Sequence, residues 1–224
     1  MRRTKSEALE TREALLDAAE TIFFEKGVSG TSLTDIANAA SLTRGAIYWH
    51  FADKAALFEA MQERGRLPQE YVTKLLEASD RPDPLELVCQ VATDALGYLA
   101  TNERSQRICT IMLLRCEFVG EMSEILVRMR QADEHMCQAV RAAFHDAEKR
   151  GLLSDDWTAE TATMAHIATI TGLIMQWLRS ERGFDLLAVG EPLMRMTFQG
   201  FARTGACRGT VPAERAIRLP QRVG

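Results

Sequence analysis

Apolar residues recur at three- and four-residue spacing along almost the whole chain, and this periodicity constrains the fold more than any other feature. Between residues 9 and 23 they form one stripe: Leu9, Leu15, Leu16, Ala19, Ile22 and Phe23. This spacing matches one face of an α-helix, whereas a half-buried strand would alternate every second residue. Strand signals are nearly absent from the rest of the chain. The sequence therefore predicts an all-α protein.

Capping residues divide the first part of this pattern into short helices. Gly27 is placed to end the first helix, because glycine readily takes the left-handed backbone at a helix C-terminus. Ser32 and Asp35 have the spacing of a capping box, which predicts a second helix that ends near residue 40. Thr43 caps a third helix, which runs through His50. The N-terminal part thus reads as three helices.

Breakers and periodicity also divide the remainder. Asp53 caps a fourth helix, which Gly65 and Pro68 are expected to kink or restart. Five longer helices follow, at residues 84–101, 103–114, 121–150, 158–180 and 187–203. The segment after them is basic and interrupted by glycine and proline, which predicts a disordered tail. We therefore predict an N-terminal helix-turn-helix domain at 1–53, a helical ligand-binding and dimerisation domain at 54–204, and the tail at 205–224.

The second and third helices are joined by a tight turn at Ser41 and Leu42, which makes them a helix-turn-helix candidate. The third helix can dock through apolar residues, so its outer face carries Thr43, Arg44, Gly45, Tyr48 and Trp49. Arginine can fork onto guanine, hydroxyls bind phosphate and glycine permits close approach, so this face suits a DNA groove. The alternative interpretation is that Tyr48 and Trp49 merely pack a small helical subdomain.

The distribution of charge supports an anionic partner only locally. The formal net charge is −4, which gives no overall signal for nucleic acid. Residues 1–6 and 36–52 nevertheless contain no carboxylate, so an anion would meet these two stretches first. The five cysteines form no CxxC, and neither a signal peptide nor an apolar run of membrane-spanning length is visible. We expect a cytoplasmic protein with reduced thiols and no membrane partner.

Two motifs resemble the DNA-binding signature of TetR-type one-component regulators: Thr31-Ser32-Leu33-x-x-Ile36-Ala37 and Thr43-Arg44-Gly45-Ala46-Ile47-Tyr48-Trp49-His50-Phe51-x-x-Lys54. Two others are similar to the AcrR/TtgR branch, whose members repress multidrug efflux pumps: Arg2-Arg3-Thr4-Lys5 and Arg115-Cys116-Glu117-Phe118-Val119-Gly120-Glu121-Met122. The resemblance implies a homodimeric repressor in which the last two helices pair with their copies in a four-helix bundle.

The resemblance also implies roles for individual residues. Arg44 and Gly45 would meet base edges, and Lys54 would contact a phosphate. The implied DNA-binding set is Arg2, Arg3, Lys5, Thr31, Ser32, Thr43, Arg44, Gly45, Tyr48, Trp49, His50 and Lys54. Relatives usually carry glycine at the position of Ser41. A left-handed backbone there would cost serine about 1 kcal/mol.

The helices at 103–114 and 158–180 are apolar on more than one side, so other helices, a partner subunit or a ligand must enclose them. A plain core explains any one of these residues. As a set, methionine, small and β-branched side chains suit a pocket that repacks around varied guests. Positions that match pocket residues of the branch are Cys109, Leu113, Ile167, Ile170, Thr171, Ile174 and Met175. Thr171 and Gly172 are interpreted as room for a guest.

Enzymatic activity is not predicted, because the chain has no HExxH, no glycine-rich phosphate loop and no GxSxG. No catalytic residue, metal site or cofactor is expected, and His166 is interpreted as a core histidine rather than a ligand contact. The predicted function is a repressor that binds a pseudo-palindromic operator in double-stranded DNA, controls a multidrug efflux operon and is released by a small hydrophobic ligand. The alternatives are a TetR-type sensor of another metabolite, such as a fatty-acyl or signalling lipid, and an all-helical enzyme or scaffold.

Overall fold

The structure is a computed structural model that describes residues 5–65, 72–74, 76 and 83–203. Its regular elements are α1 (Lys5–Lys26), α2 (Leu33–Ala39), α3 (Arg44–His50), α4 (Lys54–Arg64), α6 (Pro84–Thr101), α7 (Glu103–Leu114), the short 3-10 helix η1 (Gly120–Met122), α8 (Ser123–Lys149), α9 (Ala159–Arg179) and α10 (Leu186–Phe201). The all-α prediction is confirmed. None of the helices in these ranges has the length and apolar character needed to cross a membrane.

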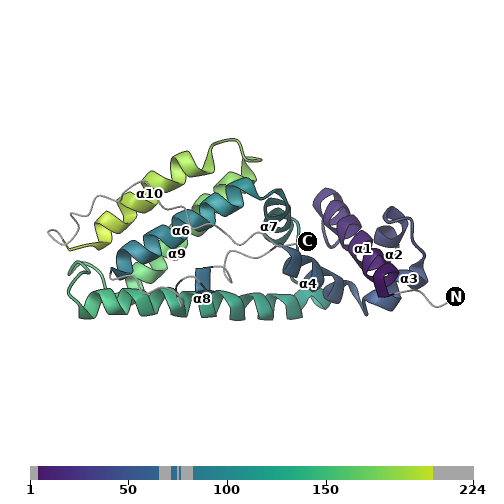
Figure 1. Cartoon of the computed structure of the whole chain (residues 1–224), viewed down its shortest axis with the longest axis horizontal. Coiled ribbons are helices and arrows are strands. Elements are labelled where there is room, and N and C mark those ends of the chain that lie inside the picture. Colours follow the sequence, from purple (N-terminus) through teal and green to yellow (C-terminus); the bar gives the residue numbers. More distant parts are fainter. Residues whose placement is uncertain (1–4, 66–71, 75, 77–82, 204–224) are drawn as a thin grey trace.

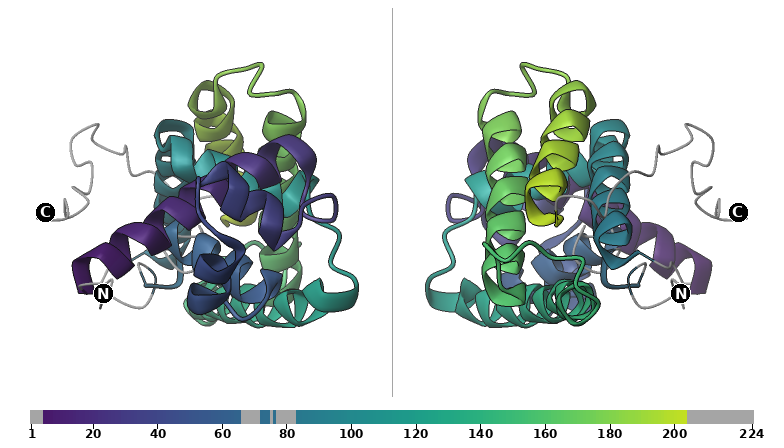
Figure 2. Two further views of the ribbon diagram at one scale, coloured as in Figure 1. Left: turned by 90° about the vertical axis from the view of Figure 1, so that its right-hand side faces the viewer. Right: turned by 90° about the vertical axis from the view of Figure 1, so that its left-hand side faces the viewer.

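The helices form a small head at one end of an elongated body (Figure 1). Helices α1, α2 and α3 make up the head, and α4 leads from it into the body. Helix α8 runs along one long side of the body, with α6, α9 and α10 opposite it. Helix α10 packs mainly on α6 and α9 mainly on α8, and the end-on views show α9 and α10 beside each other (Figure 2). The predicted tail at 205–224 and Pro68 lie outside the described residues.

Local capping chemistry sets the helix ends of the head much as predicted. Gly27 has a φ of 78°, in the left-handed region that favours glycine, and its amide donates to the carbonyl of Phe23. The Ser32 hydroxyl accepts from the Asp35 amide, and the Asp35 carboxylate accepts from the Ser32 amide. Helix α4 begins after the cap Asp53 and ends at Arg64. The predicted interruption near Gly65 is therefore confirmed.

The head shares one hydrophobic core with the start of the body. Phe23 and Ile47 of the head belong to the same buried cluster as Phe58 of α4, and Ile108 and Met112 of α7. The predicted domain boundary coincides with the start of α4 but not with a break in this core. A movement of α4 or α7 would therefore displace side chains that pack directly against the head.

Candidate DNA-binding and ligand-binding sites

The turn between α2 and α3 has the geometry that a helix-turn-helix requires. Ser41 has a φ of 57°, so a non-glycine residue occupies the left-handed region at the predicted position. The amide of Ser41 donates to the carbonyl of Asn38 at 3.0 Å, and that of Leu42 donates to Ala37 at 2.8 Å. These hydrogen bonds bring the chain around sharply, so that α3 can lie across α2.

Helix α3 is short, and it depends on a cap and on two apolar anchors. The Thr43 hydroxyl accepts from the amide of Ala46 at 3.2 Å, which satisfies one of the free donors of the first turn. Ile47 is fully buried and Phe51 is 3% exposed. These contacts fix which side of α3 faces away from the core.

The outward side of α3 presents large polar and aromatic groups. Trp49 is 72% exposed and Tyr48 is 47% exposed. The Arg44 guanidinium lies 5.4 Å from the centre of the Tyr48 ring, which is cation–π geometry. A Cβ at Gly45 would meet only the Thr43 hydroxyl, at 3.8 Å, so glycine leaves room for close approach. An exposed helix face of this kind, without a carboxylate, fits the major groove.

Two predicted DNA-binding residues, Thr31 and Ser32, make hydrogen bonds within the head. The Thr31 side chain is buried, and its hydroxyl donates to the carbonyl of Gly27 at 2.7 Å. Thr31 therefore does not lie on the DNA-facing surface, which differs from the prediction. Ser32 is exposed, but its hydroxyl accepts from the Asp35 amide and donates to the Asp35 carboxylate at 2.6 Å. Its main work is to cap α2.

The predicted ligand-binding residues fall into an inner and an outer group. Cys109 of α7 is 6% exposed and belongs to a buried cluster against which Ile170 and Ile174 of α9 pack. Ile167 packs against a neighbouring cluster, and Met175 is half-buried. Leu113 and Thr171 are exposed in the single chain.

Gly172, interpreted from the sequence with Thr171 as room for a guest, is also exposed, and a Cβ there would meet nothing within 4 Å. The two positions therefore lie on the outward side of α9 and not in the interior of the body. An open hollow of about 320 Å³ lies on α8 between Val127 and Gln138, and none of the predicted ligand residues lines it. Within the described ranges, no group of three His, Cys, Asp or Glu side chains could hold a metal ion.

The comparisons with known proteins agree with this geometry. Residues 15–61 match the family described as bacterial regulatory proteins, tetR family, and residues 83–201 match the C-terminal region of MAATS-type transcriptional repressors. The repressor BepR of Brucella suis is 42% identical over 199 residues, which cover 89% of this chain and 95% of BepR. This chain belongs to the TetR family. It is a ligand-responsive DNA-binding transcription regulator and not an enzyme.

Solved structures of TetR-family proteins have the same fold. NalD, the secondary repressor of the MexAB-OprM multidrug efflux pump in Pseudomonas aeruginosa, is similar with a TM-score of 0.80 and 40% identity, over 89% of this chain and 100% of NalD. SmeT of Stenotrophomonas maltophilia, in its complex with triclosan, is similar with a TM-score of 0.76 and 27% identity, over 95% and 100% of the two chains.

Lys54 matches the TetR-family motif but points inward in this chain. Its ammonium group donates to the carbonyls of Val28 and Thr31, both at 3.2 Å. An ammonium group has three donors, so two are engaged within the head. Lys54 therefore ties the start of α4 to the turn before α2, and the predicted phosphate contact stays a prediction. Lys5 begins α1 and is exposed, whereas Arg2 and Arg3 lie outside the described residues.

Two polar residues of this TetR-family chain are buried: His166 is a core histidine, as interpreted from the sequence, and Glu20 was not singled out there. His166 lies among aromatic rings, its Nδ1 has no hydrogen-bond partner in the described part of the chain, and burial lowers its pKa to about 4. Glu20 is 1% exposed on α1 and was not predicted as a functional residue. The available signal was spacing, since Glu20 follows Leu16 by four positions and precedes Phe23 by three.

Proposed function

We propose that this chain is the homodimeric repressor of a multidrug efflux operon, released from its operator by a small apolar ligand. The observation that carries the proposal is the exposed outer face of α3, with Arg44, Tyr48 and Trp49 and without a carboxylate. Efflux control is supported by the 40% identity to NalD, a repressor of a multidrug efflux pump. The likeness covers both the head and the body.

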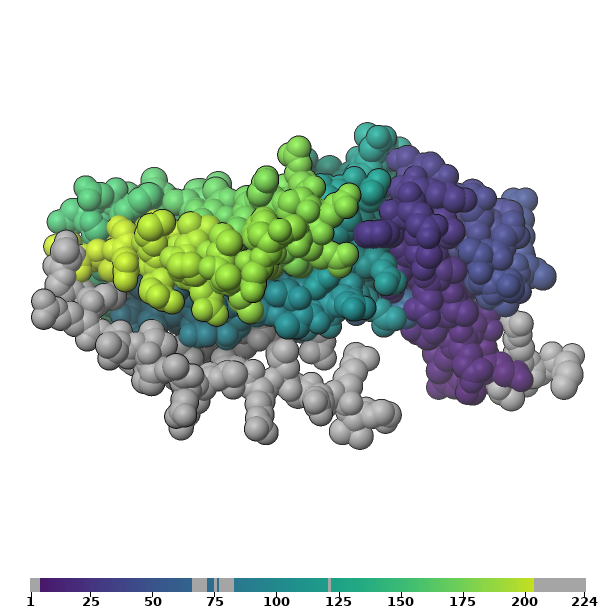
Figure 3. All heavy atoms as spheres, turned by 90° about the horizontal axis from the view of Figure 1, so that it is seen from above, coloured from purple at the N-terminus to yellow at the C-terminus, as the bar shows by residue number. Residues whose placement is uncertain are grey.

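The homodimer is supported by apolar side chains on the outside of α9 and α10. Met164 is 61% exposed, Met196 64% and Val189 43%. Figure 3 shows that both helices form part of the molecular surface over much of the body. Exposed apolar patches of this kind are typical of protein interfaces. A short recognition helix reads few base pairs, so two copies are needed for a specific pseudo-palindromic site.

An apolar ligand is supported by the residues that α7 and α9 bring together. Cys109, Ile170 and Ile174 meet in one cluster and offer no charged group to a guest. SmeT binds triclosan, a chlorinated aromatic phenol, in its solved complex. A ligand of similar size and polarity would gain from burial among these side chains.

The decisive experiment is a mobility-shift titration on the DNA upstream of the chain's own gene. Arg44→Ala should weaken specific binding by about 1–3 kcal/mol, because one forked arginine–guanine contact is lost. Arg130→Ala, on the exposed side of α8, removes the same charge away from α3 and should bind as the parent does. Equal binding by both variants would show that α3 is not the reading helix.

Ligand release is tested on the same DNA. Triclosan should displace the parent protein, whereas a fatty-acyl thioester should not. Release by the thioester alone would favour the lipid-sensor alternative. Light scattering at micromolar concentration checks the assembly, and a monomer would contradict the proposed dimer.

A further inference from the structure

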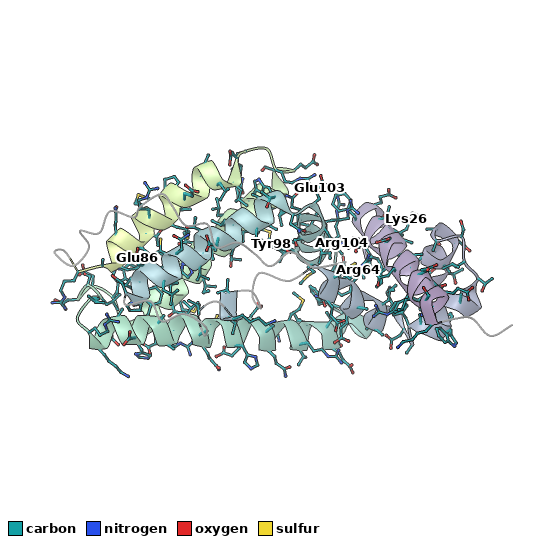
Figure 4. The ribbon with its side chains drawn as sticks, in the orientation of Figure 1. Lys26, Arg64, Glu86, Tyr98, Glu103 and Arg104 are labelled. Carbon is teal, nitrogen blue, oxygen red and sulfur yellow. The ribbon has the colours of Figure 1, made fainter. Side chains whose placement is uncertain are left out.

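Glu20 places a carboxylate where the head, α4 and α7 meet. Its side chain is 2% exposed, and three arginines surround it. Arg64 Nη1 lies 2.9 Å and Arg104 Nε 3.4 Å from Glu20 Oε1, and Arg107 Nη1 lies 3.9 Å from Glu20 Oε2. Figure 4 shows Arg64 and Arg104 close together beside α1, at the ends of α4 and α7. One buried charge thus joins the head to two helices of the body.

A second carboxylate extends this contact toward the solvent. Asp17, one turn before Glu20 on α1, lies 2.5 Å from Arg64 Nη2 and 3.2 Å from Arg104 Nη2. We call Asp17, Glu20, Arg64 and Arg104 the junction cluster. Asp17 is 59% exposed, so its ion pairs are screened by water. The electrostatic contact between the head and the body therefore depends mainly on Glu20.

The junction cluster is a poor source of stability. Burial raises the pKa of Glu20, and the attraction of Arg104 and Arg64 opposes that rise without cancelling it. The pair formed by Glu20 Oε1 and Arg64 Nη1 is close, but neither atom has hydrogen-bond geometry to a partner. The attraction between two buried charges offsets the free energy lost by removing them from water only when they also form well-aligned hydrogen bonds. A buried charge that does not stabilise the fold can still determine how two parts are oriented.

Helix α7 connects the junction cluster to the interior of the body. The Ser105 hydroxyl donates to the carbonyl of Gly65 at 2.6 Å, which fixes the end of α4 against α7. At the other end of α7, the Val28 amide of the head donates to the carbonyl of Arg115 at 2.9 Å. Cys109 lies between these two contacts and faces the interior cluster. A shift of α7 around a ligand would therefore displace the end of α4 at one contact and the head at the other.

We propose that Glu20 is a positioning residue: with Arg64 and Arg104 it holds the head in the orientation that binds operator, and ligand release works against this contact. The inference rests on the proposed function, because it assumes operator binding and a ligand beside α7. It assigns to Glu20 an effect on DNA binding although the side chain lies away from α3.

The test is Glu20→Gln, which keeps the size of the side chain and removes its charge. Operator dissociation constants should rise between about twofold and thirtyfold, the range measured for coupled residues outside a binding site. The melting temperature should fall, because removing one partner of a buried ion pair leaves the Arg64 guanidinium with less compensating charge, so operator binding is titrated well below the unfolding transition. Asp146→Asn is the matched control, since its exposed ion pair with Arg150 lies within α8. It should leave both measurements unchanged.

A double-mutant cycle with Arg104→Gln separates positioning from a general structural effect. Both single variants should bind operator more weakly than the parent. The dissociation constant of the double variant should not exceed that of the single variant with the larger loss. The triclosan concentration for half-maximal release should fall in both single variants. Operator affinity equal to the parent's in Glu20→Gln, or additive losses in the double variant, would overturn the inference alone. A parent protein that does not retain the DNA would instead refute the proposed function.

Discussion

Ser41 offers a direct test of the backbone geometry of the helix-turn-helix. Its φ of 57° places an L-residue in the left-handed region, within the turn that sets α3 on α2. The crowding of Cβ against the following carbonyl makes this conformation unfavourable by about 1–2 kcal/mol. Glycine has no Cβ and adopts it freely. Ser41→Gly should therefore stabilise the protein.

The magnitude follows from two opposing effects. Removing Cβ relieves the left-handed backbone, but glycine also gives the unfolded chain about 0.4–1 kcal/mol of additional conformational freedom. The net gain should be about 0.5–1 kcal/mol. For a chain of 224 residues this corresponds to a rise in melting temperature of about 1–4 °C. The side chain of Ser41 is exposed, so little packing is lost.

Urea unfolding followed by circular dichroism measures this gain, at one fixed protein concentration because a dimer's stability depends on it. Ser41→Ala is the control, since alanine keeps the Cβ and should give no gain. If Ser41→Gly is no more stable than Ser41→Ala, the turn does not have the left-handed geometry. Operator binding should be retained in Ser41→Gly, because the capped helix α3 is unchanged.

Three further predictions concern the cap, the dimer and acid stability. Thr43→Ala should cost about 1 kcal/mol of unfolding free energy and weaken operator binding, with Thr43→Ser close to the parent in both assays. Met196→Asp should leave the protomer folded by circular dichroism but monomeric by light scattering, whereas Val127→Asp, on exposed α8, should leave the dimer intact. Because the pKa of His166 is about 4, against an ordinary 6.5, the folded state resists protonation and loses stability as the pH falls from about 6.5 toward 4. The parent should lose about 2 kcal/mol between about pH 7 and 5 through this group, and a smaller pH dependence in His166→Leu than in His135→Gln measures it.

The helices could be predicted because their ends depend on neighbouring residues. The predicted range 103–114 coincides with α7, whose cap Asn102 accepts from the Ser105 amide. The last helix was predicted at 187–203 and spans Leu186–Phe201. Packing was less predictable. Leu9 shares the periodic stripe of α1 but is 56% exposed. The local pattern could not predict this, because it does not show where a helix extends beyond the helices that pack on it.

The candidate site divides in the same way. The exposed face of α3 follows from periodicity, since Ile47 and Phe51 determine the buried side. Thr31 and Lys54 could not be assigned from their motif, because their hydrogen-bond partners are backbone carbonyls that only the tertiary fold brings near. Likewise, the sequence places Thr171 on an apolar helix but does not show which side faces another helix.

Helix α7 also contacts the turn that leads into α10. Gln106 is buried, donates to the carbonyls of Leu99 and Ala100, and accepts from Arg182 at 2.8 Å. Arg182 and its neighbour Glu181 both have positive φ, which is costly for residues with a Cβ. The hydrogen bond to Gln106 thus holds a turn that would otherwise favour another backbone. A ligand that displaces α7 would loosen this turn together with the junction cluster, so a single displacement could change both the orientation of the head and the start of the proposed dimer helix.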